Sequence, residues 1–160
     1  MTSAELERRI RLWLWAFIVG LVVSGATALP LETELKVLAR LAGEGDSGLA
    51  VWLRTVRDAL IDTNARYPFI AYGTDWLAFA HFMIAIAFIG PLRDPVRNVW
   101  VIEFGMIACV LVVPFALVMG AVRGIPLGWR LLDCSFGVFG ILPLWICRRH
   151  IRDLERMKAA

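Results

Sequence analysis

The sequence is poor in charge and in the residues that build most cofactor and disulfide sites. Only 19% of its 160 residues are charged, and it has three cysteines and two histidines. Cys109, Cys134 and Cys147 stand in separate apolar segments without CxxC spacing, so neither a disulfide framework nor a zinc site is indicated. They are expected to be small packing residues. No P-loop, HExxH or G-x-S-x-G motif occurs.

Apolar residues are abundant instead. They make up 59% of the chain, and its mean hydropathy is +0.69. A soluble domain of this length has too small a core to hide so much apolar surface, so the composition indicates a membrane protein and excludes disordered and nucleic-acid-binding classes. The net charge of +3 comes mostly from residues that flank apolar segments, which makes it a signal of topology.

Four apolar segments are long enough to cross a hydrocarbon layer of about 30 Å as helices. They are residues 12–31, 69–92, 99–122 and 131–147. The sequence therefore predicts an all-α integral membrane four-helix bundle that forms a single domain over residues 1–160. Pro114 and Pro143 fall inside the third and fourth spans, where kinks are expected because proline removes a backbone donor.

The first span allows two interpretations. Three arginines precede it and Ala26-Thr27-Ala28 forms an A-x-A site, as in a cleavable secretory signal. Small residues also recur in it at every fourth position, which lets a neighbouring helix or a second copy of the chain approach closely. We favour this packing role for the stripe: Ala16, Gly20, Ser24 and Ala28.

Basic residues predict that both termini are cytoplasmic, in a plasma membrane or a bacterial-type inner membrane. The side of the termini carries Arg8, Arg9, Arg11, Arg93, Arg97, Arg148, Arg149, Arg152, Arg156 and Lys158. The opposite side carries Lys36, Arg40, Arg54, Arg57, Arg66, Arg123 and Arg130. Most of these lie in one long loop, and the positive-inside rule gives long loops less weight. Tryptophan, which prefers the headgroup level, agrees with this topology.

The external segment of residues 32–66 contains two amphipathic helix patterns around a Gly-rich turn at residues 43–48. We expect two short helices on the extracytoplasmic side. They could cap the bundle, lie on the membrane surface, or pack on each other as a hairpin.

Four ionisable residues interrupt the spans: Asp75, His81, Glu103 and Asp133. Each costs about 2.5 to 3.5 kcal/mol at mid-bilayer, less near the ends, so each needs a partner or a function. Asp75 and Asp133 share a depth near the outer surface and could form an acidic pair that binds a cation or works as acid and base. The alternative is a salt bridge at the interface, because Arg130 lies one turn before Asp133, and Arg66 and Arg123 border the same surface.

His81 and Glu103 could meet across adjacent helices, because their predicted depths differ by only about 6 Å. Alternatively, His81 is a packed neutral imidazole, and Glu103 pairs with Arg97 or Arg93 in the preceding turn. A haem held by two histidines is excluded because His150 belongs to the cytoplasmic tail. No cofactor or metal is expected, since the candidate ligands are scattered.

The predicted layout has four spans, both ends inside and a long external amphipathic segment after the first span. This layout is similar in outline to that of the EXPERA family, which includes sterol isomerases. The likeness is one of layout. It implies that Asp75, His81 and Glu103 could hold an amine or sterol-like ligand. Signal peptidase II is similar in having four spans with an outward aspartate pair, but its Asn-Asp-rich motifs are missing around Asp75 and Asp133.

The sequence thus leads to three functional hypotheses. The first is binding of a hydrophobic or cationic small molecule, or a lipid, in a bundle interior lined by Asp75, His81, Glu103 and Asp133. The second is an intramembrane isomerase or proton-transfer enzyme, with His81 and Glu103 as acid and base. The third is a structural or accessory subunit that docks through the small-residue stripe of the first span.

Overall fold

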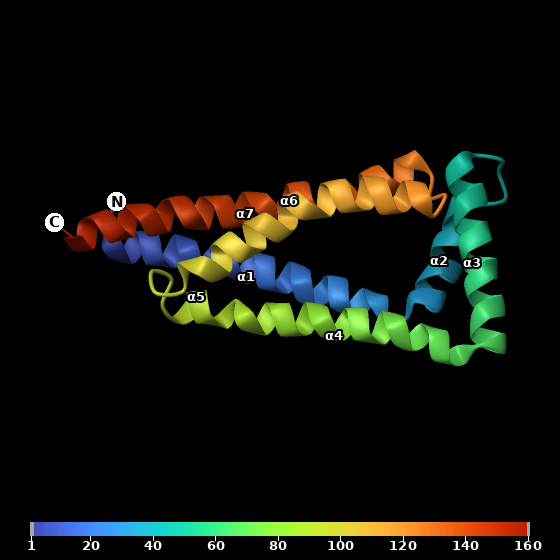
Figure 1. The fold of residues 1–160 in the computed structure, drawn as a ribbon, viewed down its shortest axis with the longest axis horizontal. Coiled ribbons are helices and arrows are strands. Elements are labelled where there is room, and N and C mark those ends of the chain that lie inside the picture. The colour runs from blue at the N-terminus through green and yellow to red at the C-terminus, as the bar shows by residue number, and fades with distance from the viewer. Residues whose placement is uncertain (1, 160) are drawn as a thin grey trace. The chain divides into compact units, whose positions relative to one another are not determined.

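The computed structural model describes residues 2–159, with side chains over residues 2–157, and its regular secondary structure in that range is all helical, without strands. The elements are α1 (Ser3–Ala28), α2 (Leu31–Ala42), α3 (Gly48–Arg66), the 3-10 helix η1 (Pro68–Ala71), α4 (Tyr72–Ala87), α5 (Ile89–Arg93), α6 (Val99–Val122) and α7 (Leu127–Ala159) (Figure 1). The side chain of Lys158, which contributes to the predicted orientation, lies outside the described residues.

Four helical segments are long and apolar enough to cross a membrane. They are Ser3–Ala28, Pro68–Arg93, Val99–Val122 and Leu127–Met157. The prediction of an all-helical chain with four such helices is therefore confirmed. The assembly of the four into one bundle and the sidedness of the termini stay predictions.

The first span ends earlier than the sequence predicted. α1 stops at Ala28, whereas the apolar run continues to Leu31, the first residue of α2. Leu29 precedes Pro30, and a residue before proline is disfavoured in the helical region because the proline ring crowds its backbone. The chain therefore turns here, and a new helix begins.

Proline also divides the second span, where no break was predicted. α4 ends at Ala87 and α5 begins at Ile89, since Pro91 has no amide hydrogen to donate to the carbonyl of Ala87. By contrast, α6 and α7 each continue as one helix through Pro114 and Pro143.

The chain forms two compact units. Unit 1 comprises residues 1–20 and 85–160, and unit 2 comprises residues 21–84. The helices α1 and α4 contribute residues to both units, whereas the α6–α7 pair belongs to unit 1 and the α2–α3 pair belongs to unit 2.

In unit 1, α6 and α7 form an antiparallel hairpin (Figure 1). The turn between them is a Schellman motif: Gly124 adopts a φ of 69°, and the Ile125 amide donates to the Gly120 carbonyl at 2.8 Å. Further along the pair, Gly137 of α7 lies directly against the Cys109 carbonyl of α6. A side chain at Gly137 would push the two helices apart, so this glycine sets their separation.

The beginning of α1 packs in unit 1 through residues spaced by one helical turn. Leu6, Ile10 and Leu14 are buried, and the thiol of Cys147 in α7 donates to the Ile10 carbonyl at 3.6 Å. Cys147 therefore acts as a small packing residue, as the sequence predicted.

In unit 2, α2 and α3 pack on each other, which is one of the three arrangements that the amphipathic patterns allowed. Leu35 and Ala39 of α2 and Ala50 and Leu53 of α3 are buried. The guanidinium of Arg54 closes the hairpin by donating to two carbonyls of the connecting loop, at 2.7 and 3.1 Å. On which side of the membrane the hairpin lies stays a prediction.

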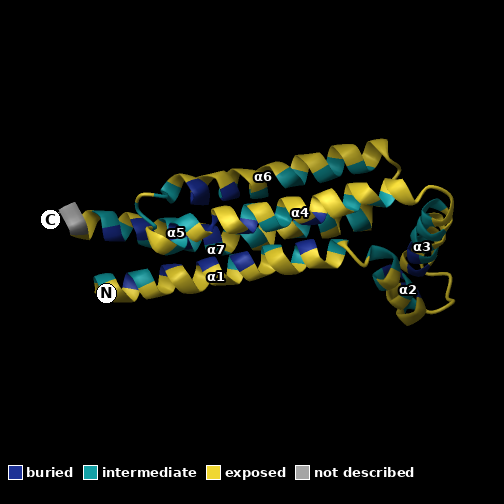
Figure 2. Ribbon diagram, turned by 90° about the horizontal axis from the view of Figure 1, so that it is seen from below, coloured by how far each residue is buried: buried dark blue, intermediate teal, exposed yellow. Residues whose placement is uncertain are grey.

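Exposed residues cover long stretches of the span helices, as the yellow ribbon of α6 shows in Figure 2, and many of them are large apolar residues. On α6 they include Val110, Leu111, Phe115 and Val118. Extended apolar surface of this kind is unfavourable in water and is the expected surface of a helix in a hydrocarbon layer.

We predict that Gly137→Ala destabilises the protein by about 1 to 3 kcal/mol, because the new methyl group would overlap the Cys109 carbonyl and the Val112 side chain. Thermal unfolding in detergent, followed by circular dichroism, measures this effect. Gly128→Ala is the matched control, since it lies on the same helix with nothing within 4 Å of the added methyl group. Equal unfolding temperatures for the two variants would contradict the packing described here.

Candidate functional site

A cavity of about 340 Å³ lies in unit 2, where the end of α1, the α2–α3 hairpin and the beginning of α4 meet. The hairpin contributes residues from both of its helices, and α4 contributes residues from its first turn. No lysine or arginine belongs to the lining. The polar side chains that line it are Glu32, Thr33, Asn64, Thr74 and Asp75.

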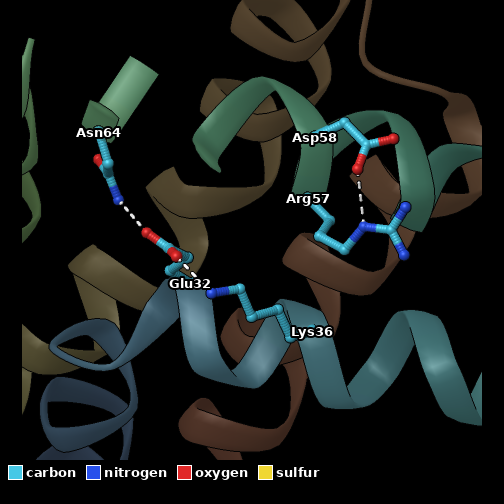
Figure 3. Close-up of polar contacts among 5 residues, drawn as sticks. All are labelled: Glu32, Lys36, Arg57, Asp58 and Asn64. Carbon is cyan, nitrogen blue, oxygen red and sulfur yellow. Dashed lines mark hydrogen bonds and ion pairs between the residues drawn. The ribbon is translucent and has the colours of Figure 1, made fainter. Parts of the chain in front are cut away.

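Glu32 stands in the first turn of α2, where the partial positive charge of the helix end favours a carboxylate. Its carboxylate accepts hydrogen bonds from Lys36, one turn later, at 2.6 Å and from the Asn64 amide of α3 at 2.7 Å (Figure 3). The hydrogen bond from Lys36, which has the larger effect, and that from Asn64 hold the pKa of Glu32 below its usual value of 4.5. Glu32 is therefore ionised at neutral pH.

The second ion pair in Figure 3 is independent of the cavity. Arg57 and Asp58 are neighbours on α3, with Nε and Oδ1 2.8 Å apart, and neither lines the cavity. Their hydrogen bond raises the pKa of Arg57 and lowers that of Asp58. Exposed pairs of this kind contribute little to stability, so we assign it no functional role.

Asp75 is the second carboxylate of the cavity, and it is exposed. Among the described residues it forms no ion pair. Its negative charge is therefore available to a ligand, whereas that of Glu32 is shared with Lys36.

Two neutral polar side chains of the cavity donate hydrogen bonds within the protein. The hydroxyl of Thr74 donates to the Ala71 carbonyl at 2.7 Å, and the amide nitrogen of Asn64 donates to Glu32 at 2.7 Å. Since a hydroxyl has a single hydrogen, the Thr74 oxygen is left as an acceptor. The charged acceptors of the cavity are the two carboxylates.

His81 lies on α4, close to α1. Its Nδ1 lies 2.8 Å from the Leu77 carbonyl of its own helix. Gly25 of α1 approaches so closely that an added Cβ would lie 2.9 Å from the Cβ of His81. The neighbouring Ala78 is fully buried. His81 does not line the Glu32–Asp75 cavity.

Glu103 has a different partner from the arginines that the sequence suggested. Instead of Arg93 or Arg97, Arg148 of α7 donates from Nε to the Glu103 carboxylate at 2.8 Å. This pair joins the first turns of α6 to a part of α7 distant in sequence. His81 and Glu103 belong to different units, and each has a partner within its own unit.

The predicted salt bridge between Asp133 and Arg130 is not formed. The Arg130 guanidinium instead donates to the Ile125 and Leu117 carbonyls, at 2.8 and 3.4 Å, and so holds the α6–α7 turn. Free carbonyls in a helix-ending turn are strong acceptors, so they compete with the Asp133 carboxylate for this guanidinium. The proposed pairing of Asp133 with Asp75 joins residues of different units and stays a prediction.

The small-residue stripe predicted on α1 is only partly covered. Ala16 and Gly20 are exposed, and nothing lies within 4 Å of a Cβ added at Gly20. The close helix approach occurs at Gly25, which is not in the stripe. Association of a second copy through the stripe stays a prediction.

Sequence reasoning missed Glu32 and Asn64 as site residues. Glu32 marked only the end of the first apolar run, and Asn64 lay unremarked near the end of α3. Their contact depends on the pairing of α2 with α3, which brings together positions 32 residues apart. The available signal was the carboxylate in the first turn of a predicted helix directly after a span.

Metal ligation has no support in residues 2–157, where no three His, Cys, Asp or Glu side chains come close enough to hold an ion. Comparisons with protein-family models, with curated proteins and with solved structures found no match to this chain.

The ion pair of Glu32 predicts an acid-sensitive contribution to stability. Because its folded-state pKa lies below 4.5, the pair stabilises the fold above that pH, and the stabilisation is lost as the pH falls through the folded-state pKa. Glu32→Gln should therefore unfold at a lower temperature than the wild type at neutral pH, and this difference should shrink in acid. Glu34→Gln, on the same helix but outside the network, is the control. A difference that is independent of pH would contradict the assignment.

Proposed function

We propose that this chain is an integral membrane protein that binds a cationic small molecule, a protonated amine, in the Glu32–Asp75 cavity. The observation that carries the proposal is the chemistry of the lining: two carboxylates and no lysine or arginine. A ligand that is positively charged and rich in N–H donors complements such a lining.

The carboxylates have unequal roles in this proposal. Asp75, without an ion pair in the described residues, is the main counter-ion of the ligand. Glu32 keeps Lys36 and Asn64 as partners and adds negative potential. The Thr74 oxygen supplies a further acceptor. Acceptors of this kind favour a primary or secondary amine over a quaternary ammonium, because only the former have N–H groups.

This proposal revises the site expected from the sequence. It keeps a cationic ligand and Asp75, and it replaces His81, Glu103 and Asp133 by Glu32, Asn64 and Thr74. With both termini in the cytoplasm, the cavity would open on the extracytoplasmic side. The isomerase and accessory-subunit hypotheses stay predictions, and no contact in either unit favours them over ligand binding.

Benzylamine is a suitable probe, with benzyl alcohol as its neutral analogue. At neutral pH we expect benzylamine, but not the alcohol, to raise the unfolding temperature of the detergent-solubilised protein and to give a saturable calorimetric binding signal. Asp75→Asn should weaken binding by about ten-fold or more, the equivalent of one charge-assisted hydrogen bond of about 1.5 to 3 kcal/mol. Glu32→Gln should weaken it less.

Two variants serve as controls for that measurement. Asp133→Asn removes a carboxylate from a span outside the cavity, and Glu34→Gln removes one from α2 outside the lining. Both should bind benzylamine as the wild type does. Equal effects of benzylamine and benzyl alcohol, or binding that survives Asp75→Asn unchanged, would refute the proposed function.

A further inference from the structure

Asp75 lines both the Glu32–Asp75 cavity and an adjoining groove. The groove has a volume of about 230 Å³ and lies along α4. The other residues of that groove are Tyr72, Trp76 and Phe79. Their spacing with Asp75 is i, i+3, i+4 and i+7, so all four lie on one face of the helix.

The three aromatic rings form a continuous edge-to-face ladder. The ring centroids of Tyr72 and Trp76 are 5.8 Å apart, and those of Trp76 and Phe79 are 5.5 Å apart. Each ring is about half exposed, although α4 is part of a segment that is apolar enough to span a membrane. The ladder extends about 10 Å along the helix, at about 1.5 Å per residue, from the first residue of α4 toward its middle.

We propose that the ligand is an amphiphilic amine, whose protonated head binds at Asp75 and whose apolar chain lies along the Tyr72–Trp76–Phe79 groove. This inference rests on the proposed function and names the ligand class of the same site. The cavity is lined by two carboxylates, which favour a positively charged group with hydrogen-bond donors. The groove is lined by three aromatic side chains, which favour an apolar group. A molecule that fills both has one cationic end and one apolar end.

The position of the groove also sets the route of entry. Because the groove is on the exposed face of a candidate span, its occupant lies at the boundary with lipid, and the ligand reaches Asp75 from within the membrane. A zwitterionic phospholipid fits poorly, because its phosphate would stand beside Glu32 and Asp75. A single-chain amphiphile with one positive charge carries no such repulsion.

Photo-crosslinking of the full-length protein in phosphatidylcholine vesicles tests the inference. The probe is dodecylamine with a diazirine near the middle of its chain, since Phe79 lies about 6 Å from Asp75 along the helix. The control probe is dodecanol with the same group at the same position. We expect the amine probe to label α4 around Phe79, and the alcohol probe to label it about ten-fold less. Unlabelled dodecylamine should displace the amine probe, and phosphatidylethanolamine added to the vesicles should not.

Two variants distinguish the contribution of the ligand's charged head from that of its apolar chain. Asp75→Asn should reduce labelling by the amine probe about ten-fold. Phe79→Ala should reduce the affinity for dodecylamine about two- to ten-fold, the equivalent of one aromatic contact, while leaving benzylamine binding unchanged. Phe115→Ala removes a comparably exposed ring from α6 and should change neither affinity.

The outcomes distinguish this inference from the proposed function. If benzylamine binds in an Asp75-dependent way but the amine probe labels the apolar surfaces of all spans evenly, the amphiphilic ligand is refuted and the cation site stands. Competition by phosphatidylethanolamine would likewise refute a single-chain ligand. If benzylamine does not bind, the proposed function fails and this inference fails with it.

Discussion

Close approach of helix backbones at glycine is the contact on which both units depend. Between helices in lipid there is little hydrophobic driving force, so van der Waals contact over short distances must hold them together. Gly137 permits it between α7 and α6, and Gly25 permits it between α1 and α4. At both positions the near atoms include a backbone carbonyl oxygen, which cannot move aside as a flexible side chain can. Within each unit, such contacts set how closely the helices pack.

The cost of burying polar groups explains where the ionisable residues lie. Among the described residues no polar or charged side chain is buried. Arg148 pairs with Glu103, and Arg130 binds the Ile125 carbonyl in the turn between α6 and α7. Both arrangements satisfy charges that would be expensive to leave alone in an apolar region. Asp75 differs because it faces a cavity without an ion-pair partner from the described residues, which is why it is the centre of the proposed site.

Selectivity in that cavity would come mainly from its charge. The hydroxyl hydrogen of Thr74 is donated to the Ala71 carbonyl, so its oxygen is left as an acceptor. An anion would be repelled by the two carboxylates, whereas an ammonium group would donate hydrogen bonds to them. The aromatic groove beside Asp75 adds an apolar contact that a fully water-soluble ion could not use.

Composition and apolar run length determined by themselves that the chain is helical with four segments able to span a membrane, because these properties depend on residues close in sequence. Asp75 was recognisable as a candidate for the same reason: a carboxylate interrupts an apolar run. The partners of Glu103, Arg130 and Asn64 were decided only by the tertiary structure, since each contact depends on which helices pair and in what register. Side chains at helix ends have several partners within reach, and sequence spacing alone cannot rank them.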